Sequence, residues 1–164
     1  MVCGKGVNML KLEQRVPSLS LCKKLKSISY PQEGLFWWKR YYKTDKYFLT
    51  DTNNPEAQFM TSGVDDYIVA PTVAEMGEWL PNYIDDVDGT GYGYHLVVWK
   101  TNNAYRVMYV HRNSTKFTNK IRVSRTDKTE ANARAKILIW LVENKYIDFE
   151  RFRGCIKTTL LGSA

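Results

Sequence analysis

Long apolar runs, paired cysteines and histidines are absent or scarce in this sequence. No apolar segment approaches the roughly 20 residues of a membrane-spanning helix, and the first residues lack the apolar core of a signal peptide. The three cysteines, Cys3, Cys22 and Cys155, are odd in number and widely spaced, without a CxxC pair. This pattern indicates reduced thiols and argues against a disulfide framework or a structural zinc site. We therefore expect a cytoplasmic protein without membrane association.

Catalytic and metal-binding motifs are missing as well. The two histidines, His95 and His111, fall on opposite faces of a predicted hairpin, so they cannot share one metal ion. The acidic run DDVDG (85–89) fails the calcium-loop pattern at both ends, where Ile84 and His95 stand. No GxSxG motif and no complete phosphate-binding glycine loop is present. Nothing in the sequence argues for an enzyme, and we expect no cofactor and no metal.

The composition is that of a folded chain with an uneven charge distribution. With 164 residues, 44% hydrophobic and 13% aromatic, it fits a single domain (1–164), with a loose arm at 1–16 and a flexible tail at 154–164. Residues 1–46 contain ten basic and three acidic residues, residues 47–99 nine acidic and no basic ones, and residues 100–164 fourteen basic and five acidic. Either these blocks neutralise each other in the fold, or they form a basic surface for an anionic partner.

The first half of the chain predicts two helices and a hairpin. Ser18 is the candidate N-cap of a helix with apolar residues at every third position, and the YPQEG run (30–34) ends that helix. Residues 36–42 and 46–50 are rich in aromatic residues and indicate two strands. Thr72 and Glu75 form a T-x-x-E capping box, which predicts a short helix that ends before Pro81.

The second half predicts a hairpin and a long helix. Residues 94–101 and 104–112 form the clearest hairpin, and residues 121–123 are a candidate third strand. A turn at Asn102–Asn103 sets the register of this hairpin and divides its residues between two faces: Tyr94, Leu96, Val98, Tyr105, Val107, Tyr109 and His111 on one, and His95, Val97, Trp99, Arg106, Met108 and Val110 on the other. Both faces are largely apolar, so we expect both to be covered at least in part. Asp127 is the candidate cap of the last helix. The expected fold is therefore α+β: an antiparallel sheet of two hairpins with an N-terminal helix, a short central helix and a long C-terminal helix.

Basic residues interleaved with aromatic ones suggest nucleic-acid binding, since phosphate contact and base stacking need these two residue types. The alternative is that the aromatic residues form the core and the cations keep the protein soluble. The candidate residues form two groups, one in the GLFWWKRYY stretch and one after the second hairpin: Lys39, Arg40, Tyr41 and Tyr42, and Arg112, Lys116, Lys120, Arg122 and Arg125.

Three segments resemble a family of small uncharacterised proteins encoded by phages, prophages and mobile elements of gut bacteria. They are LCKKLKSISYPQEGLFWW (21–38), YIVAPTVAEMGEWLP (67–81) and TEANARAKILIWLVENKYI (129–147). The resemblance covers roughly a third of the chain, with the segments in the same order. It implies a virus-linked accessory protein located in the cytoplasm of the host cell, and it supplies no activity or catalytic residue.

The leading hypothesis is a non-enzymatic accessory protein that binds an anionic partner, most simply nucleic acid. The first alternative is a protein-binding module, either an inhibitor or adaptor of a host protein or a homo-oligomer, based on the apolar hairpin faces around Trp99 and Met108. The second alternative is a sponge for a signalling nucleotide.

Overall fold

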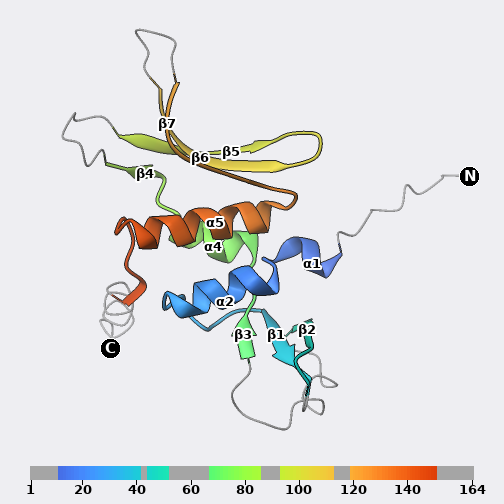
Figure 1. The fold of residues 1–164 in the computed structure, drawn as a ribbon. Helices are drawn as coiled ribbons and strands as arrows, with labels where there is room; N and C mark the ends of the chain where they lie inside the picture. The colour runs from blue at the N-terminus through green and yellow to red at the C-terminus, as the bar shows by residue number, and fades with distance from the viewer. Residues whose placement is uncertain (1–10, 42–43, 52–66, 86–92, 113–118, 151–164) are drawn as a thin grey trace, which may run out of the picture.

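The structure is a computed structural model that describes residues 11–41, 44–51, 67–85, 93–112 and 119–150. The fold is α+β, as predicted, and Figure 1 shows its helices and strands. In chain order the elements are α1 (Leu12–Arg15), α2 (Leu19–Ser27), β1 (Phe36–Arg40), β2 (Tyr47–Asp51), β3 (Tyr67–Val69), α4 (Val73–Trp79), β4 (Tyr83–Ile84), β5 (Tyr94–Lys100), β6 (Tyr105–Arg112), β7 (Asn119–Asp127) and α5 (Glu130–Glu143).

The strands form two antiparallel sheets rather than one. The first predicted hairpin belongs to a three-stranded sheet of order β2-β1-β3, and the second belongs to a four-stranded sheet of order β4-β5-β6-β7. The candidate strand at 121–123 is the middle of β7, which pairs with β6 from Asn119 to Asp127. The two predicted hairpins are therefore both present, but they belong to two different sheets.

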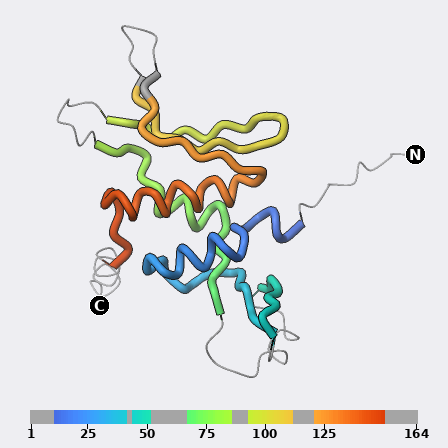
Figure 2. Tube along the Cα trace, in the orientation of Figure 1, coloured from blue at the N-terminus to red at the C-terminus, as the bar shows by residue number. Residues whose placement is uncertain are grey.

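The helices lie between the two sheets (Figures 1 and 2). α5 packs on β6 and β7, α4 and α2 pack against α5, and α2 also packs on β3. The larger apolar core is enclosed by α5, α4 and the four-stranded sheet, whereas a smaller cluster of Val16, Cys22, Ile68 and Ala70 joins the N-terminal segment to the three-stranded sheet. The four-stranded sheet thus has one face directed at α5 and one face directed away from it, whereas both faces of the three-stranded sheet contribute side chains to a core cluster.

The N-terminal arm predicted at 1–16 is wrong for its last residues. Leu12–Arg15 form α1, and Val16 is fully buried in the smaller cluster. Ser18 is the N-cap residue of α2, as predicted, but its side chain accepts no hydrogen bond from the helix. Its backbone N–H instead donates to Asn132 Oδ1 of α5 at 2.8 Å. The predicted arm at 1–10 and the predicted tail at 154–164 lie outside the described residues.

The central helix begins as its sequence predicts. The Thr72 hydroxyl accepts from the Glu75 N–H at 3.2 Å, and the Glu75 carboxylate accepts from the Thr72 N–H at 2.6 Å. This capping box satisfies two helix N-terminal donors that have no partner within the helix. Glu75 also accepts from the Leu35 N–H at 3.3 Å. Since a Cβ on Gly34 would lie 2.8 Å from Val69 Cγ2, only glycine fits where this turn meets β3.

The N-cap predicted for the last helix, Asp127, is wrong by two residues. The N-cap is Thr129, whose hydroxyl accepts from the Asn132 N–H at 3.2 Å. Asp127 is still the last residue of β7, and its Oδ1 accepts from the Thr129 N–H at 3.4 Å and from Asn132 Nδ2 at 3.0 Å. The carboxylate therefore supports the turn before the helix rather than the helix terminus itself.

Candidate binding surface

The cations of the GLFWWKRYY stretch are engaged within the three-stranded sheet. Lys39 Nζ lies 5.1 Å from the ring centroid of Tyr67 on the adjacent strand. Arg40 lies at the exposed end of β1, and its Nη1 is 3.9 Å from Asp45 Oδ1. Both side chains therefore have partners inside the protein, and these contacts compete with a phosphate for them.

The aromatic residues of this stretch give no stacking platform. The Tyr41 ring lies 4.6 Å from the Phe48 ring, tilted against it by 45°. Trp37 Nε1 donates to Gly34 O, and Trp38 Nε1 donates to Pro17 O at 3.3 Å. Tyr42 lies outside the described residues. The stretch is mostly a strand whose rings contact the protein itself.

The second predicted group is only partly described. Arg112 ends β6 and Lys120 lies near the start of β7, where the backbone alone is described, and Lys116 lies outside the described residues. Arg122 lies at the register shift between β6 and β7, and its Nε donates to Tyr146 Oη at 3.2 Å. Arg125 Nη1 donates to Ser124 O at 3.0 Å. Both described guanidinium groups thus bind atoms of the protein.

The two predicted groups belong to different sheets. Lys39 and Arg40 are on β1, whereas Arg122 and Arg125 are on β7, and the helices lie between these strands (Figure 1). The described members therefore do not form one continuous basic surface.

The structure instead exposes one face of the four-stranded sheet, the face directed away from α5. We call it the outer face. The β5–β6 register is the predicted one, with Val97 opposite Met108 and Trp99 opposite Arg106. The outer face consists of alternate strand residues: Tyr83 on β4; His95, Val97 and Trp99 on β5; Arg106, Met108 and Val110 on β6; and Ile121, Ser124 and Thr126 on β7.

Large apolar side chains gather on the outer face. Trp99 is 60% exposed, Ile121 48%, Tyr83 45% and Val97 37%. The expectation that both hairpin faces are covered holds for β6, where Met108 and Val110 are buried, and is wrong for β5. Trp99 Nε1 has no hydrogen-bond partner in the described part of the chain. An exposed apolar patch of this kind marks an interaction site more often than a solvated surface.

Tyr83 and His95 form an aromatic pair at one end of the outer face. They are cross-strand neighbours on β4 and β5, and their ring centroids are 5.3 Å apart at an interplanar angle of 63°. A Cβ on Gly93 would overlap the Tyr83 ring, so glycine at this position is what lets the ring lie against the backbone. A local sequence pattern could not reveal this pair, because residues 85–92 separate β4 from β5.

Trp99 and Arg106 lie together at the other end of the outer face. They are directly opposite each other on β5 and β6, and both are exposed. The guanidinium of Arg106 has no ion-pair partner among the described residues. His95 and Trp99 are four residues apart on one strand, which corresponds to roughly 13 Å at about 3.4 Å per residue. No described strand residue of the outer face is acidic.

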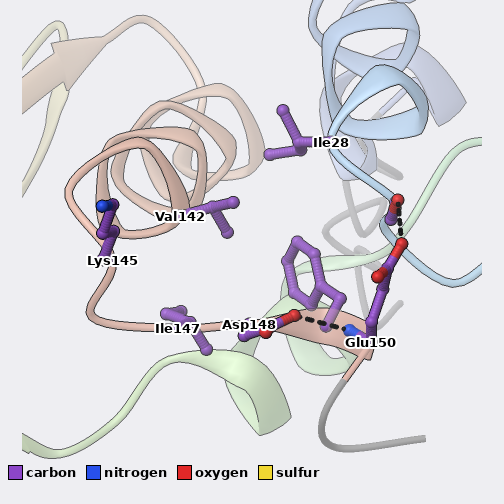
Figure 3. Close-up of a pocket in the computed structure, with 8 residues that line it drawn as sticks. Ile28, Val142, Lys145, Ile147, Asp148 and Glu150 are labelled. Atoms are coloured by element: carbon purple, nitrogen blue, oxygen red, sulfur yellow. Dashed lines mark hydrogen bonds between the residues drawn. The ribbon is translucent and has the colours of Figure 1, made fainter.

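A pocket lies where α2 and α5 both end (Figure 3), with a volume of about 580 Å³. Its walls include the apolar residues Ile28, Val142, Ile147 and Phe149. Its rim holds two carboxylates, and one of them, Glu150, accepts from the Ser29 hydroxyl at 3.2 Å. Among the described residues that line it, Lys145 is the only cation, beside the carboxylates of Asp148 and Glu150. The described lining is therefore a poor match for the phosphates of a signalling nucleotide.

The described residues contain little that indicates catalysis or metal binding. His95 is on the outer face and His111 on the opposite face, where its Nδ1 is 3.1 Å from Gly93 O. No group of three or more possible metal ligands occurs among the described residues, and most of the DDVDG loop lies outside them. Burial raises the pKa of the Cys22 thiol to about 12, so this thiol is not a nucleophile. None of the described helices is long and apolar enough to cross a membrane.

Comparisons with known proteins place the chain in no family. No family model matches it, and the searches of curated proteins and of solved structures return no match either. The resemblance to proteins of phages and mobile elements therefore stays a prediction.

Proposed function

We propose that the protein is a non-enzymatic accessory protein of a phage or mobile element that binds single-stranded nucleic acid on the outer face of the four-stranded sheet. The observation that carries the proposal is the composition of this face. It exposes Tyr83, His95, Trp99 and Arg106, and none of its described strand residues is acidic.

The two ends of the outer face suit the two parts of a nucleotide. A base can stack on the exposed ring of Trp99, and Arg106 directly across the strand pair can bind the adjacent phosphate. A second base can stack on the Tyr83–His95 pair. The two stacking positions are roughly 13 Å apart, whereas stacked bases are about 3.4 Å apart, so a strand that reaches both positions must be extended. The ligand is single-stranded, because the bases of a duplex are paired and cannot stack on these side chains.

The cations predicted from the sequence contribute less to binding than the outer face does. Lys39, Arg122 and Arg125 contact other groups of the protein, and Arg40 lies on the other sheet in an exposed ion pair with Asp45, so these cations add to the net charge of +7 rather than to the outer face. A positive net charge speeds the approach of an anionic polymer and makes binding dependent on salt.

The test is fluorescence anisotropy with short labelled oligothymidylate and oligouridylate at low and at physiological salt. We expect binding that weakens with salt, and a loss of roughly tenfold in affinity for Trp99→Ala, since stacking of one base contributes about 1–3 kcal/mol. Arg106→Gln should weaken binding more than Lys46→Gln, which removes the same charge from an exposed position just before β2 of the other sheet. Absence of binding at low salt would overturn the proposal.

A protein partner is the second candidate, because Val97 and Ile121 add aliphatic surface between the aromatic positions. Ile121→Ser separates the two candidates. It should leave oligonucleotide affinity within about twofold, whereas loss of an apolar anchor from a protein interface commonly costs more than 1 kcal/mol. Oligonucleotide binding that is insensitive to Trp99→Ala and lost in Ile121→Ser would favour the protein partner.

A further inference from the structure

Strand β5 is only half covered on the side that faces β4. β4 is two residues long and pairs with Tyr94 and His95 alone. One more hydrogen bond follows, from the Leu96 N–H to Asn82 O at 3.1 Å. From Val97 to Lys100 no described strand pairs with this side of β5, and Figure 1 shows the closed end of the β5–β6 hairpin extending away from β4.

The backbone groups on this open edge can be assigned from two hydrogen bonds. The Leu96 N–H points towards β4, whereas the Thr101 N–H donates across the hairpin to Ala104 O at 2.8 Å. Alternate residues of a strand direct their N–H and C=O groups to opposite neighbours. Val98 and Lys100 therefore direct both groups to the open edge, where they need a partner other than β6.

The open edge also lacks the features that protect most edge strands. Sheet edges in soluble proteins are commonly blocked by proline, by a bulge or by charges along the strand. The Val97–Trp99 segment has none of these, and all three side chains are exposed, Trp99 most of all. The one charge is Lys100, at the end of the strand.

We propose that a second copy of the chain adds its own β5 to this edge, antiparallel and across a two-fold axis at Trp99. Asn82 already occupies the position opposite Leu96, so an added strand can pair only from Val97 onward. With Trp99 opposite the second copy's Trp99, Val98 lies opposite the second copy's Lys100. The backbone groups of these residues then form two reciprocal pairs of hydrogen bonds.

This register is self-complementary in its side chains. The two Trp99 residues form the central pair without backbone hydrogen bonds, where facing Cα atoms are about 4.5 Å apart and the side chains contact most closely. The most exposed apolar side chain of the strand thereby buries part of its surface. Each Lys100 faces Val98 of the other copy rather than its Lys100, so like charges are not directly opposite. A symmetric arrangement of this kind closes as a dimer.

The dimer is a separate inference from nucleic-acid binding. It joins the two outer faces into one continuous surface, but each face keeps its own Tyr83, His95 and Arg106. Val98→Pro retains Trp99, so as a monomer it should still bind a short oligonucleotide, whereas Trp99→Lys should lose both the dimer and the stacking position. The Val98→Pro variant therefore distinguishes failure of one proposal from failure of the other.

Sedimentation equilibrium of the full chain over a concentration series tests the inference. We expect a reversible monomer–dimer equilibrium. Val98→Pro removes an N–H that points to the open edge and leaves the β5–β6 hydrogen bonds intact, so it should weaken the dimer at least tenfold. Val98→Ala, which retains the N–H, should change the dimer constant by no more than about threefold.

A second variant covers the case in which proline disturbs the strand. Trp99→Lys should abolish the dimer, because it places two like charges opposite each other, while the far-ultraviolet circular dichroism stays that of the wild type. A wild-type chain that remains monomeric into the high micromolar range would overturn the inference. So would a Trp99→Lys variant, folded as the wild type, that dimerises as tightly as the wild type.

Discussion

The three-stranded and the four-stranded sheet use similar residues for opposite purposes. β1 contains two tryptophans and two cations, and each of these four side chains contacts another part of the protein. On β5 and β6, Trp99 lies directly opposite Arg106, and both side chains are exposed without a hydrogen-bond or ion-pair partner among the described residues. An aromatic and basic composition therefore indicates a binding surface only where no other element covers the strand.

The cores beneath the two sheets differ as well, and a matched pair of substitutions measures that difference. Ile137 of α5 is fully buried in the larger core, and Ile68 of β3 is buried in the smaller cluster. We expect Ile137→Ala to lower the free energy of unfolding by about 4 kcal/mol, and Ile68→Ala by about 2 kcal/mol, because the smaller cluster relaxes more easily around the missing atoms. Urea denaturation followed by circular dichroism gives both values.

The same measurement tests whether the two sheets unfold together. α2 packs on both α5 and β3, so we expect a single transition with the same urea dependence in both variants. A loss at Ile68 equal to that at Ile137, or two separate transitions, would contradict the expectation that the two sheets unfold together around the larger core.

Trp38 of β1 and Trp99 of β5 are a matched pair of tryptophans, one from each sheet. Trp38→Ala removes a half-buried ring and the hydrogen bond to Pro17 O, so it should cost about 2 kcal/mol of stability. Trp99→Ala should change stability by no more than about 0.5 kcal/mol, because its ring is mostly exposed. Oligonucleotide affinity should respond in the reverse order, with a loss only for Trp99→Ala. Equal effects of the two variants on affinity would remove the distinction between the sheets.

The elements were predictable from sequence where their signals are local. The capping box of Thr72 and Glu75 and the alternation along β5 and β6 gave the correct helix start and the correct strand register. The sequence does not decide the cap of α5, because Asp127 and Thr129 are both acceptable N-cap residues and Asp127 proves to be the last residue of β7. The burial of Val16 depends on residues more than 50 positions away, which no local pattern contains.

The candidate surface was predictable in part. Alternation placed His95, Val97, Trp99 and Arg106 on one face, as observed. The alternation of side chains along a strand does not show whether a second layer covers that face, because coverage depends on how helices from distant segments pack. The helices lie on the other side of the sheet, and this placement turns four strand residues into an exposed surface (Figure 1).

The smallest effect on stability that we predict concerns two ion pairs, Asp127–Lys136 next to the four-stranded sheet and Asp45–Arg40 next to the three-stranded sheet. Burial alone would raise the pKa of Asp127, but hydrogen bonds from Lys136, Asn132 and Thr129 together hold that pKa below the usual 3.8. Since the folded-state pKa is the lower one, the stabilisation is complete above 3.8 and is lost as the pH falls through the folded-state value.

Asp127→Asn should therefore lower stability at neutral pH by at most about 1 kcal/mol, and the difference from the wild type should shrink in acid. Asp45→Asn is the matched control, because Asp45 pairs with Arg40 at 3.9 Å in full contact with solvent. It should leave the denaturation midpoint unchanged at both pH values. A difference between wild type and Asp127→Asn that grows as the pH falls would show that the link between β7 and α5 depends on the protonated carboxyl instead.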